Sequence, residues 1–232
     1  MECENINCNM RNLNANSLIL GIILPLCLIV ALGCNSRSDL FVKASLGDRA
    51  AFDEYLRQGL DVNQTQGDKT TLLHAASRTD NYYMVETLLG KGAKVNITDI
   101  DSITPVMLAA NFAKPVIVRD LISHGADVKM RDVWGNSSVW YAVGGNPENI
   151  YLLVKAGADA SSQNKNGETP LLKAIDIYKT KGVGYITIST LMSLGATINC
   201  TNSDGETPTS LAIKYGDTNL DLLLFQIKPR NR

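Results

Sequence analysis

The sequence repeats itself at a nearly constant interval, and this periodicity constrains the fold more than any other feature. Five similar segments begin at Thr71, Thr104, Ser137, Thr169 and Thr207. A second series of short segments keeps the same spacing and begins at Gly59, Gly92, Gly125, Gly157 and Gly195. In both series the interval is about 33 residues, except for a longer last one, and this length is typical of solenoid repeats. Two independent landmarks that stay in phase over five copies predict a solenoid of stacked structural units.

The residues of one unit indicate how it folds. Thr104-Pro105 is a typical helix start, because proline fits the first turn, where its missing N–H leaves no helical bond unmade. A second helix is predicted over residues 115–123, where apolar residues recur at helical spacing. Gly125 follows at a position where a left-handed residue ends a helix. Because one helix pair cannot bury both of its faces, stability must come from stacking against neighbouring units.

These segments resemble ankyrin repeats, whose period is about 33 residues and whose motif is T-P-L-H-x-A. Residues 71–76 read TLLHAA, and residues 169–174 read TPLLKA. The resemblance covers residues 38–232 and implies an all-α ankyrin-repeat solenoid of about six helix-turn-helix repeats with short β-turn hairpins. The expected units are 38–66, 67–99, 100–132, 133–164, 165–202 and 203–232.

The chain departs from the family motif mainly at its histidine. Only His74 fills that position, which is occupied in the later units by Met107, Trp140, Leu172 and Ser210. In the family this histidine supports the hairpin and the helix through hydrogen bonds, so the resemblance implies a structural role for His74. Trp140 occupies a helical position of the central units, and we expect it to be largely buried.

Residues 1–33 are predicted to be a targeting segment outside the repeat domain. Residues 18–33 read LILGIILPLCLIVALG, and Arg11 precedes them, which is the order of a secretory signal peptide. Glu2 and Glu4 fit this pattern badly, and translation from Met10 would remove them. A retained transmembrane helix is an alternative, although this run covers only about 24 Å of a hydrocarbon core of about 30 Å.

The cysteine after this run suggests a more specific interpretation. Residues 31–34 read ALGC and resemble a bacterial lipobox, in which the cysteine is acylated and the chain is cut just before it; the family pattern favours leucine where Ala31 stands. The resemblance implies a lipid on Cys34, a tether over residues 34–37, and localisation in the cell envelope as a membrane-anchored lipoprotein, on the periplasmic or outer-membrane side. A plain signal peptide is the second alternative. In the lipobox interpretation, in which Cys34 carries the lipid, only Cys200 would keep a free thiol, so no intramolecular disulfide is expected.

Composition and motifs give no support for an enzyme or a nucleic-acid-binding protein. The 22 basic residues nearly balance the 23 acidic ones and form no basic block, which argues against binding through phosphate neutralisation. The chain has only two histidines and no Cys/His cluster with metal-ligand spacing, so we expect no metal and no cofactor. Residues 182–184 (GVG) are too short for a dinucleotide fingerprint, and no G-x-S-x-G elbow is present. No catalytic residues are therefore predicted.

The resemblance directs the search for functional residues to a binding surface. In ankyrin proteins the hairpin tips and the exposed edge of the first helix form a concave surface that holds partner proteins. The apolar residues at variable positions of this surface gather in the third and fourth units: Ile100, Ile103, Phe112, Val133 and Trp134. An exposed apolar patch with a tryptophan anchor is typical of a recognition surface. The alternative is that Phe112 and the Val133-Trp134 pair simply pack between adjacent hairpins.

We therefore expect a non-enzymatic protein–protein interaction module that is lipid-tethered to a bacterial envelope membrane. Its partner would be another protein at or near the same membrane, and the chain itself is expected to be monomeric. A polar rim around the apolar patch is predicted at Asp68, Arg78, Lys165 and Glu168. The alternatives are a small enzyme or enzyme accessory factor on an ankyrin scaffold, and a structural protein of the envelope.

Overall fold

Helix pairs joined by long hairpin loops make up the described part of the chain. The structure is a computed structural model that describes residues 37–181 and 184–216 together with Leu220 and Leu224; the predicted targeting segment and Cys34 lie outside these residues. Within them the chain forms eleven α-helices, and the only β pairing is an isolated bridge between Arg131 and Ser137. The helices are α2 (Arg37–Ser45), α3 (Arg49–Arg57), α4 (Leu72–Arg78), α5 (Tyr82–Gly90), α6 (Pro105–Phe112), α7 (Pro115–Ser123), α8 (Ser138–Ala142), α9 (Pro147–Lys155), α10 (Pro170–Lys181), α11 (Tyr185–Ser193) and α12 (Pro208–Tyr215).

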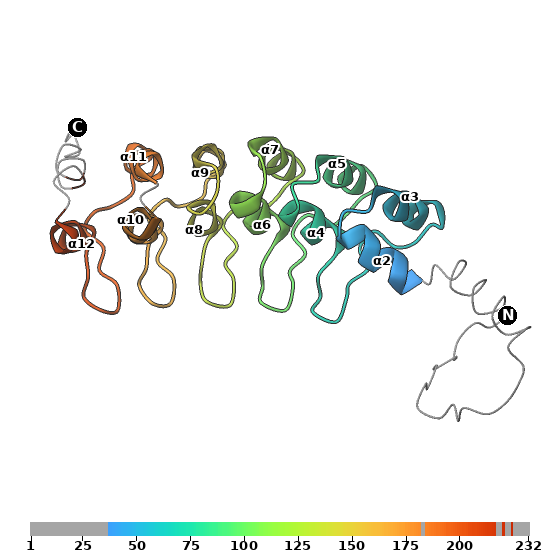
Figure 1. The fold of residues 1–232 in the computed structure, drawn as a ribbon, viewed down its shortest axis with the longest axis horizontal. Coiled ribbons are helices and arrows are strands. Elements are labelled where there is room, and N and C mark those ends of the chain that lie inside the picture. The colour runs from blue at the N-terminus through green and yellow to red at the C-terminus, as the bar shows by residue number, and fades with distance from the viewer. Residues whose placement is uncertain (1–36, 182–183, 217–219, 221–223, 225–232) are drawn as a thin grey trace, which may run out of the picture. The chain divides into compact units, whose positions relative to one another are not determined.

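The helices stand in two rows, and the hairpins project from one side. Figure 1 shows α4, α6, α8, α10 and α12 side by side in an inner row, with α3, α5, α7, α9 and α11 in an outer row above it. Successive helices of each row contact one another from α4 to α12 and from α5 to α11. We call the hairpins that point away from the outer row fingers 1 to 5; their tips are residues 66–70, 99–103, 132–136, 164–168 and 202–206. This arrangement confirms the predicted all-α repeat solenoid.

Capping residues fix where the inner helices begin. The Thr71 hydroxyl accepts the amide of His74, and Nδ1 of His74 accepts the amide of Thr71 at 3.2 Å, which closes a capping box at the start of α4. Thr207 and Ser210 close the same box at the start of α12. Proline lies in the first turn of α6, α7, α9 and α12, where no helical hydrogen bond is lost. The helix start predicted at Thr104-Pro105 is therefore confirmed.

Glycines in the left-handed conformation end the outer helices. Gly125, just after α7, has a φ of 87°, and its amide donates to the carbonyl of Ile122 at 3.0 Å. A Cβ built on Gly125 would have no atom within 4 Å. The backbone conformation, and not a lack of space, therefore requires glycine at this position.

The core lies between the two rows of helices. Ala109 and Ala110 of α6 are fully buried, as are Ile117, Val118 and Leu121 of α7. The small alanines let α6 approach α4 and α8, while the branched residues of α7 fill the space between the rows. Each unit thus presents apolar surface to its neighbours, which is how a helix pair with two apolar faces becomes stable.

Candidate functional site

A recurring aspartate or asparagine folds each tip of fingers 2 to 5. In finger 3, Oδ1 of Asp132 accepts the amides of Trp134 at 2.9 Å and Asn136 at 2.8 Å. The same two hydrogen bonds, to the second and fourth residues after it, are made by Asp99, Asn164 and Asn202. One side chain thus satisfies two backbone donors that an exposed turn would otherwise leave to water. The tips therefore share one backbone shape, which places equivalent residues in register.

Backbone hydrogen bonds join each tip to the next. The amide of Ile100 donates to the carbonyl of Asp68, that of Val133 to Asp101, that of Lys165 to Trp134, and that of Ser203 to Asn166, each at 2.9 Å. A surface formed from separate mobile loops would have to be ordered when a partner binds, at a cost in conformational entropy. Because these tips are already tied together, they present a single preorganised edge.

The structure separates the five predicted site residues into three groups. Ile100, Val133 and Trp134 lie on the tips of fingers 2 and 3, with exposed fractions of 61%, 38% and 51%. Phe112 is also exposed but is the last residue of α6, at the opposite end of that helix from finger 2. Ile103 is partly buried, because its amide is held by Asp99 and its carbonyl by His74 at the base of the finger. The tips therefore bring three of the five residues together.

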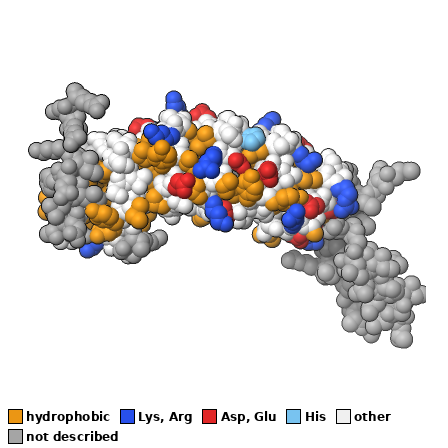
Figure 2. Space-filling view, turned by 90° about the horizontal axis from the view of Figure 1, so that it is seen from above, with side chains coloured by type: hydrophobic (Ala, Val, Ile, Leu, Met, Phe, Trp, Pro, Cys, Tyr) orange, Lys and Arg blue, Asp and Glu red, His pale blue; other side chains and the backbone are white. Residues whose placement is uncertain are grey.

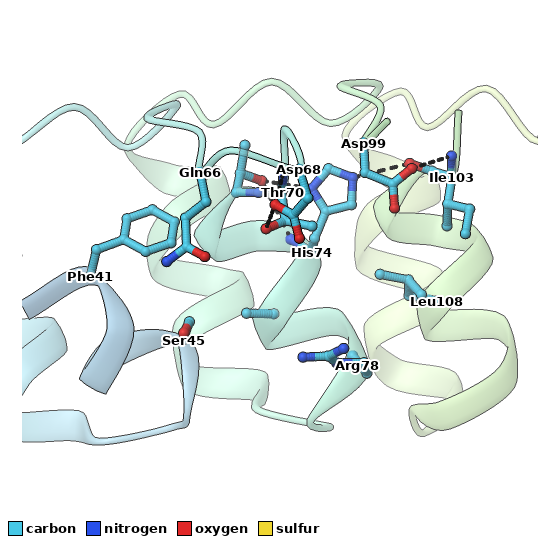
Figure 3. Close-up of a pocket in the computed structure, with 12 residues that line it drawn as sticks. Phe41, Ser45, Gln66, Asp68, Thr70, His74, Arg78, Asp99, Ile103 and Leu108 are labelled. Carbon is cyan, nitrogen blue, oxygen red and sulfur yellow. Dashed lines mark hydrogen bonds between the residues drawn. The ribbon is translucent and has the colours of Figure 1, made fainter. Parts of the chain in front are cut away.

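A hollow of about 250 Å³ lies beneath fingers 1 and 2, between α2, α4 and α6. Figure 3 shows His74 at its centre, with Phe41 and Gln66 on one side and Asp99 and Ile103 on the other. His74 is almost fully buried, and its Nε2 donates to the Ile103 carbonyl at 3.1 Å, while Nδ1 lies 2.9 Å from the Thr71 hydroxyl. Burial lowers the pKa of His74, against smaller raising contributions from the Ile103 carbonyl and Asp99. The structural role implied for His74 agrees with this geometry.

A second hollow, of about 350 Å³, lies between α8, α10 and α12, beneath fingers 4 and 5. The Lys173 ammonium sits 3.2 Å from the centroid of the Trp140 ring and donates to the Trp140 carbonyl at 2.9 Å. Burial lowers the pKa of Lys173 to about 8, against a smaller raising effect of Glu168. Asp176 and Tyr215 also line this hollow, as do Asp204 and Glu206 of finger 5.

Trp140 is expected to be largely buried, and the structure places it at intermediate exposure at the edge of this second hollow, with its indole nitrogen buried. Trp140 occupies the same helical position as His74, but an indole offers one donor and no acceptor, so it cannot accept an N-cap amide as His74 Nδ1 does. The ring instead provides a face for Lys173 of the next unit.

The four predicted rim residues lie around these features. Asp68 and Arg78 line the first hollow, and Glu168 lines the second. Lys165 is on the tip next to Trp134, to whose carbonyl its amide donates. The rim therefore spans fingers 1 to 4 and does not encircle one patch.

Sequence reasoning missed two features of this surface. The first is the aspartate or asparagine that begins the tips of fingers 2 to 5, at residues 99, 132, 164 and 202. It keeps the spacing of the repeats and could have been found by aligning the hairpins. The contact of Lys173 with Trp140 joins residues of adjacent units, and no pattern within one unit predicts it.

The described residues also contain one cysteine, and they include no metal-ligand cluster and no membrane-spanning helix. Cys200 is a buried free thiol whose Sγ lies 3.4 Å from the Thr169 hydroxyl. Among the described residues, no set of three or more His, Cys, Asp or Glu side chains could hold a metal ion. None of the helices described is long and apolar enough to cross a membrane.

Comparison with known proteins identifies the repeat. Residues 40–132 match the family model described as ankyrin repeats (3 copies). Among solved structures, an ankyrin repeat domain from Acinetobacter baumannii AYE is similar to 83% of this chain and to 98% of that chain, with 27% sequence identity and a TM-score of 0.71. A search of curated proteins found no match. Both matches are to the family that the sequence motifs resemble.

Proposed function

Because this chain belongs to the ankyrin-repeat family, we propose that it is a protein–protein interaction module whose partner docks on the finger tips. Ankyrin repeats generally bind other proteins, and the fold is typically a non-enzymatic scaffold. The finer assignment rests on the exposed residues Ile100, Val133 and Trp134, which lie on two adjacent tips that are joined by a backbone hydrogen bond. An indole that is half exposed on a preorganised edge loses little conformational entropy when a partner covers it, which is typical of binding hot spots.

The engagement of His74 supports a non-enzymatic function. Both ring nitrogens of this buried histidine are occupied, Nδ1 by Thr71 and Nε2 by the Ile103 carbonyl. A general base must have a free nitrogen within hydrogen-bond reach of the proton that it removes. His74 therefore supports the fold of fingers 1 and 2, and neither of its ring nitrogens is free to act as a base in the first hollow.

We further propose that a lipid on Cys34 tethers the domain to a bacterial envelope membrane, on the periplasmic or outer-membrane side. The support is the apolar run at residues 18–33 and the lipobox-like ALGC that ends at Cys34. The tether from Cys34 to Arg37 reaches roughly 14 Å when fully extended. A module held this close to a membrane, acting as a monomer, would bind a protein at or near the same surface.

The test of the docking surface compares two exposed aromatic residues. The full chain is immobilised, proteins of its own envelope membranes are captured, and binding of the captured protein is then measured with purified variants. Trp134→Ala should weaken that binding tenfold or more, which is about 1.4 kcal/mol. Tyr151→Ala is the matched control, because Tyr151 lies on the outer helix α9 with an exposed fraction of 48% against 51% for Trp134. Equal losses in both variants would refute the site.

The tether is tested separately. The mature protein should begin at Cys34 and carry acyl chains, which intact-mass measurement reads directly. Cys34→Ser should leave the detergent phase or remain unprocessed. A mass that includes residues 10–33 without added lipid would contradict the tether and leave the docking surface unaffected.

A further inference from the structure

The finger tips are strongly acidic, unlike the rest of the chain. The five tips contain seven carboxylates and two lysines, a net charge of −5, whereas the whole chain has a net charge of −1. The rest of the chain therefore carries +4. On the outer helices α3, α5, α7 and α9, five acidic residues are interspersed with four basic ones. Figure 2, which views the molecule from the side of these helices, shows the red acidic and blue basic side chains mixed together.

Finger 1 has the same two backbone hydrogen bonds across its tip as the other fingers, from the Gln66 amide to the Thr70 carbonyl at 3.0 Å and from the Lys69 amide to the Gln66 carbonyl at 2.9 Å. The five tips therefore place one column of side chains along their row. The third residue of each tip is Asp68, Asp101, Trp134, Asn166 and Asp204 in order. Neighbouring members of this column belong to tips that are hydrogen-bonded to one another. The exposed indole therefore lies in the same row as three carboxylates.

These carboxylates are free to bind a partner. Within the described residues, the side chains of Asp101 and Asp204 make no hydrogen bond or ion pair. Asp68 accepts the amide and hydroxyl of Thr70 through Oδ1, and these hydrogen bonds hold the pKa of Asp68 below its ordinary value. Each of the three side chains therefore keeps at least one carboxylate oxygen that accepts no hydrogen bond from the described residues.

The electrostatic environment of Tyr141 agrees with the negative net charge of the tips. The Tyr141 hydroxyl donates to Oδ2 of Asp132 at 2.8 Å. Burial raises the pKa of Tyr141 most, followed by that hydrogen bond and by the charges of Asp132, Asp99 and Asp101. Fingers 2 and 3 thus produce a negative potential next to the exposed strip of Ile100, Val133 and Trp134.

Nearby cations neutralise only part of this charge. Lys214 pairs with Glu206 at 2.7 Å, so that carboxylate is already compensated. Lys173 is directed at the Trp140 ring and carbonyl in the second hollow. Arg78 lies in the first hollow, and Lys69 and Lys165 are on the tips themselves. Arg131 donates to the Gly135 carbonyl of finger 3 at 3.0 Å. None of these residues forms a described ion pair with Asp68, Asp101 or Asp204.

We propose that the partner binds through an extended basic segment that runs along the tips, with lysine or arginine opposite Asp68, Asp101 and Asp204 and one apolar side chain against Trp134. This proposal rests on the proposed function and adds the chemistry of the partner. Complementary charge sets the register of such a segment and speeds its association, while the apolar contact supplies affinity.

The spacing of the units sets the spacing of the motif. Stacked units lie on the order of 10 Å apart, and an extended chain advances about 3.3 Å per residue. About three residues of the segment therefore match each finger. The motif should therefore be about thirteen residues long. Counted along it, the basic residues are expected at about positions 1, 4 and 13, and the apolar residue at about position 7.

The test uses a labelled synthetic peptide with this pattern of lysines and one leucine, with serine elsewhere, prepared in both chain directions. Binding to the full chain in detergent is measured by fluorescence anisotropy. We expect the better of the two directions to bind at least tenfold more tightly than a peptide with glutamate in place of lysine, and more tightly than a scrambled lysine peptide. Raising the salt concentration should weaken binding, because Asp68 and Asp204 are exposed and Asp101 is only partly buried.

Variants of the chain test whether the peptide binds to the three carboxylates of the column. The triple variant Asp68→Asn/Asp101→Asn/Asp204→Asn keeps the Oδ1 acceptor of Asp68 and should weaken peptide binding tenfold or more. The matched control removes the same charge from the outer helices with Glu86→Gln/Asp120→Asn/Glu148→Gln and should change binding less than twofold. Equal binding by the two triple variants, or by the lysine and glutamate peptides, would overturn the proposal.

The two proposals fail in different ways. If Trp134→Ala weakens capture of the natural partner but the acidic triple variant does not, the docking surface stands and the basic segment is wrong. If the triple variant weakens peptide binding and Trp134→Ala leaves natural capture intact, the acidic row binds and the apolar anchor is wrong.

Discussion

Replacing His74 with leucine tests how the repeats hold their fingers. Leucine fits the site sterically, because Leu172 fills the equivalent position of a later unit. The substitution removes the hydrogen bonds with Thr71 and the Ile103 carbonyl. Each such bond is worth about 0.5–1.5 kcal/mol, and a buried group left unpaired costs about 1–3 kcal/mol. We expect a loss of roughly 2–4 kcal/mol in the free energy of unfolding at about pH 7.5, measured by urea denaturation.

The pH dependence of the same variant separates hydrogen bonding from simple packing. Burial lowers the pKa of His74 in the folded chain. When the pH falls below about 6.5, the pKa of histidine in the unfolded chain, His74 is protonated in the unfolded chain but stays neutral in the folded chain. The wild type should therefore lose stability as the pH falls below about 6.5, by no more than about 1.4 kcal/mol per pH unit. Above that pH this residue contributes no pH dependence. His74→Leu should lack this component. Equal losses between about pH 7.5 and 5.5 in both proteins, or a loss below about 1 kcal/mol at the higher pH, would refute the reasoning.

Three further predictions follow from single residues. Gly135→Ala should cost about 1–2 kcal/mol, because Gly135 has a φ of 82° and its new Cβ would lie 3.2 Å from the Lys165 amide nitrogen; Gly205→Ala, with a φ of 75° and no atom within 4 Å, should cost less in the same urea titration. Trp140→Ala should cost about 1–3 kcal/mol, below the cost for a fully buried aromatic residue. It should also raise the pKa of Lys173 above about 8 in an NMR titration, because relief of burial, the largest cause of the lowered pKa, outweighs the lost contact with the ring. Because Cys200 is a buried free thiol, the denaturant midpoint of the repeat domain should be the same with and without reductant.

Local features of the sequence predicted the helices well. Proline in the first turn and glycine after the last turn act within a few residues, so the second helix of the third unit was predicted over 115–123, and α7 spans Pro115–Ser123. The apolar residues that recur at helical spacing are buried at Ile117, Val118 and Leu121, with Ile122 packed against them. Such features need no knowledge of the neighbouring units.

The candidate surface was harder to predict, because exposure on a hairpin depends on the turn and on the next repeat. Ile100 and Ile103 are equally apolar, but the turn made by Asp99 leaves Ile100 exposed and directs Ile103 toward His74. Trp140 lies at the edge of a hollow, where the face of its ring is covered by Lys173 of the following unit. Contacts between units are not encoded in the pattern of a single unit.

Site-specific photocross-linking tests most directly that the finger tips are the docking surface. A photoreactive amino acid replaces either Val133, on finger 3, or Val116, on the outer helix α7; these residues have exposed fractions of 38% and 37%. Both variants are irradiated with the captured partner under the same conditions. We expect a cross-linked product from position 133 and none from position 116. A product from position 116 alone would place the partner on the outer helices and contradict the account.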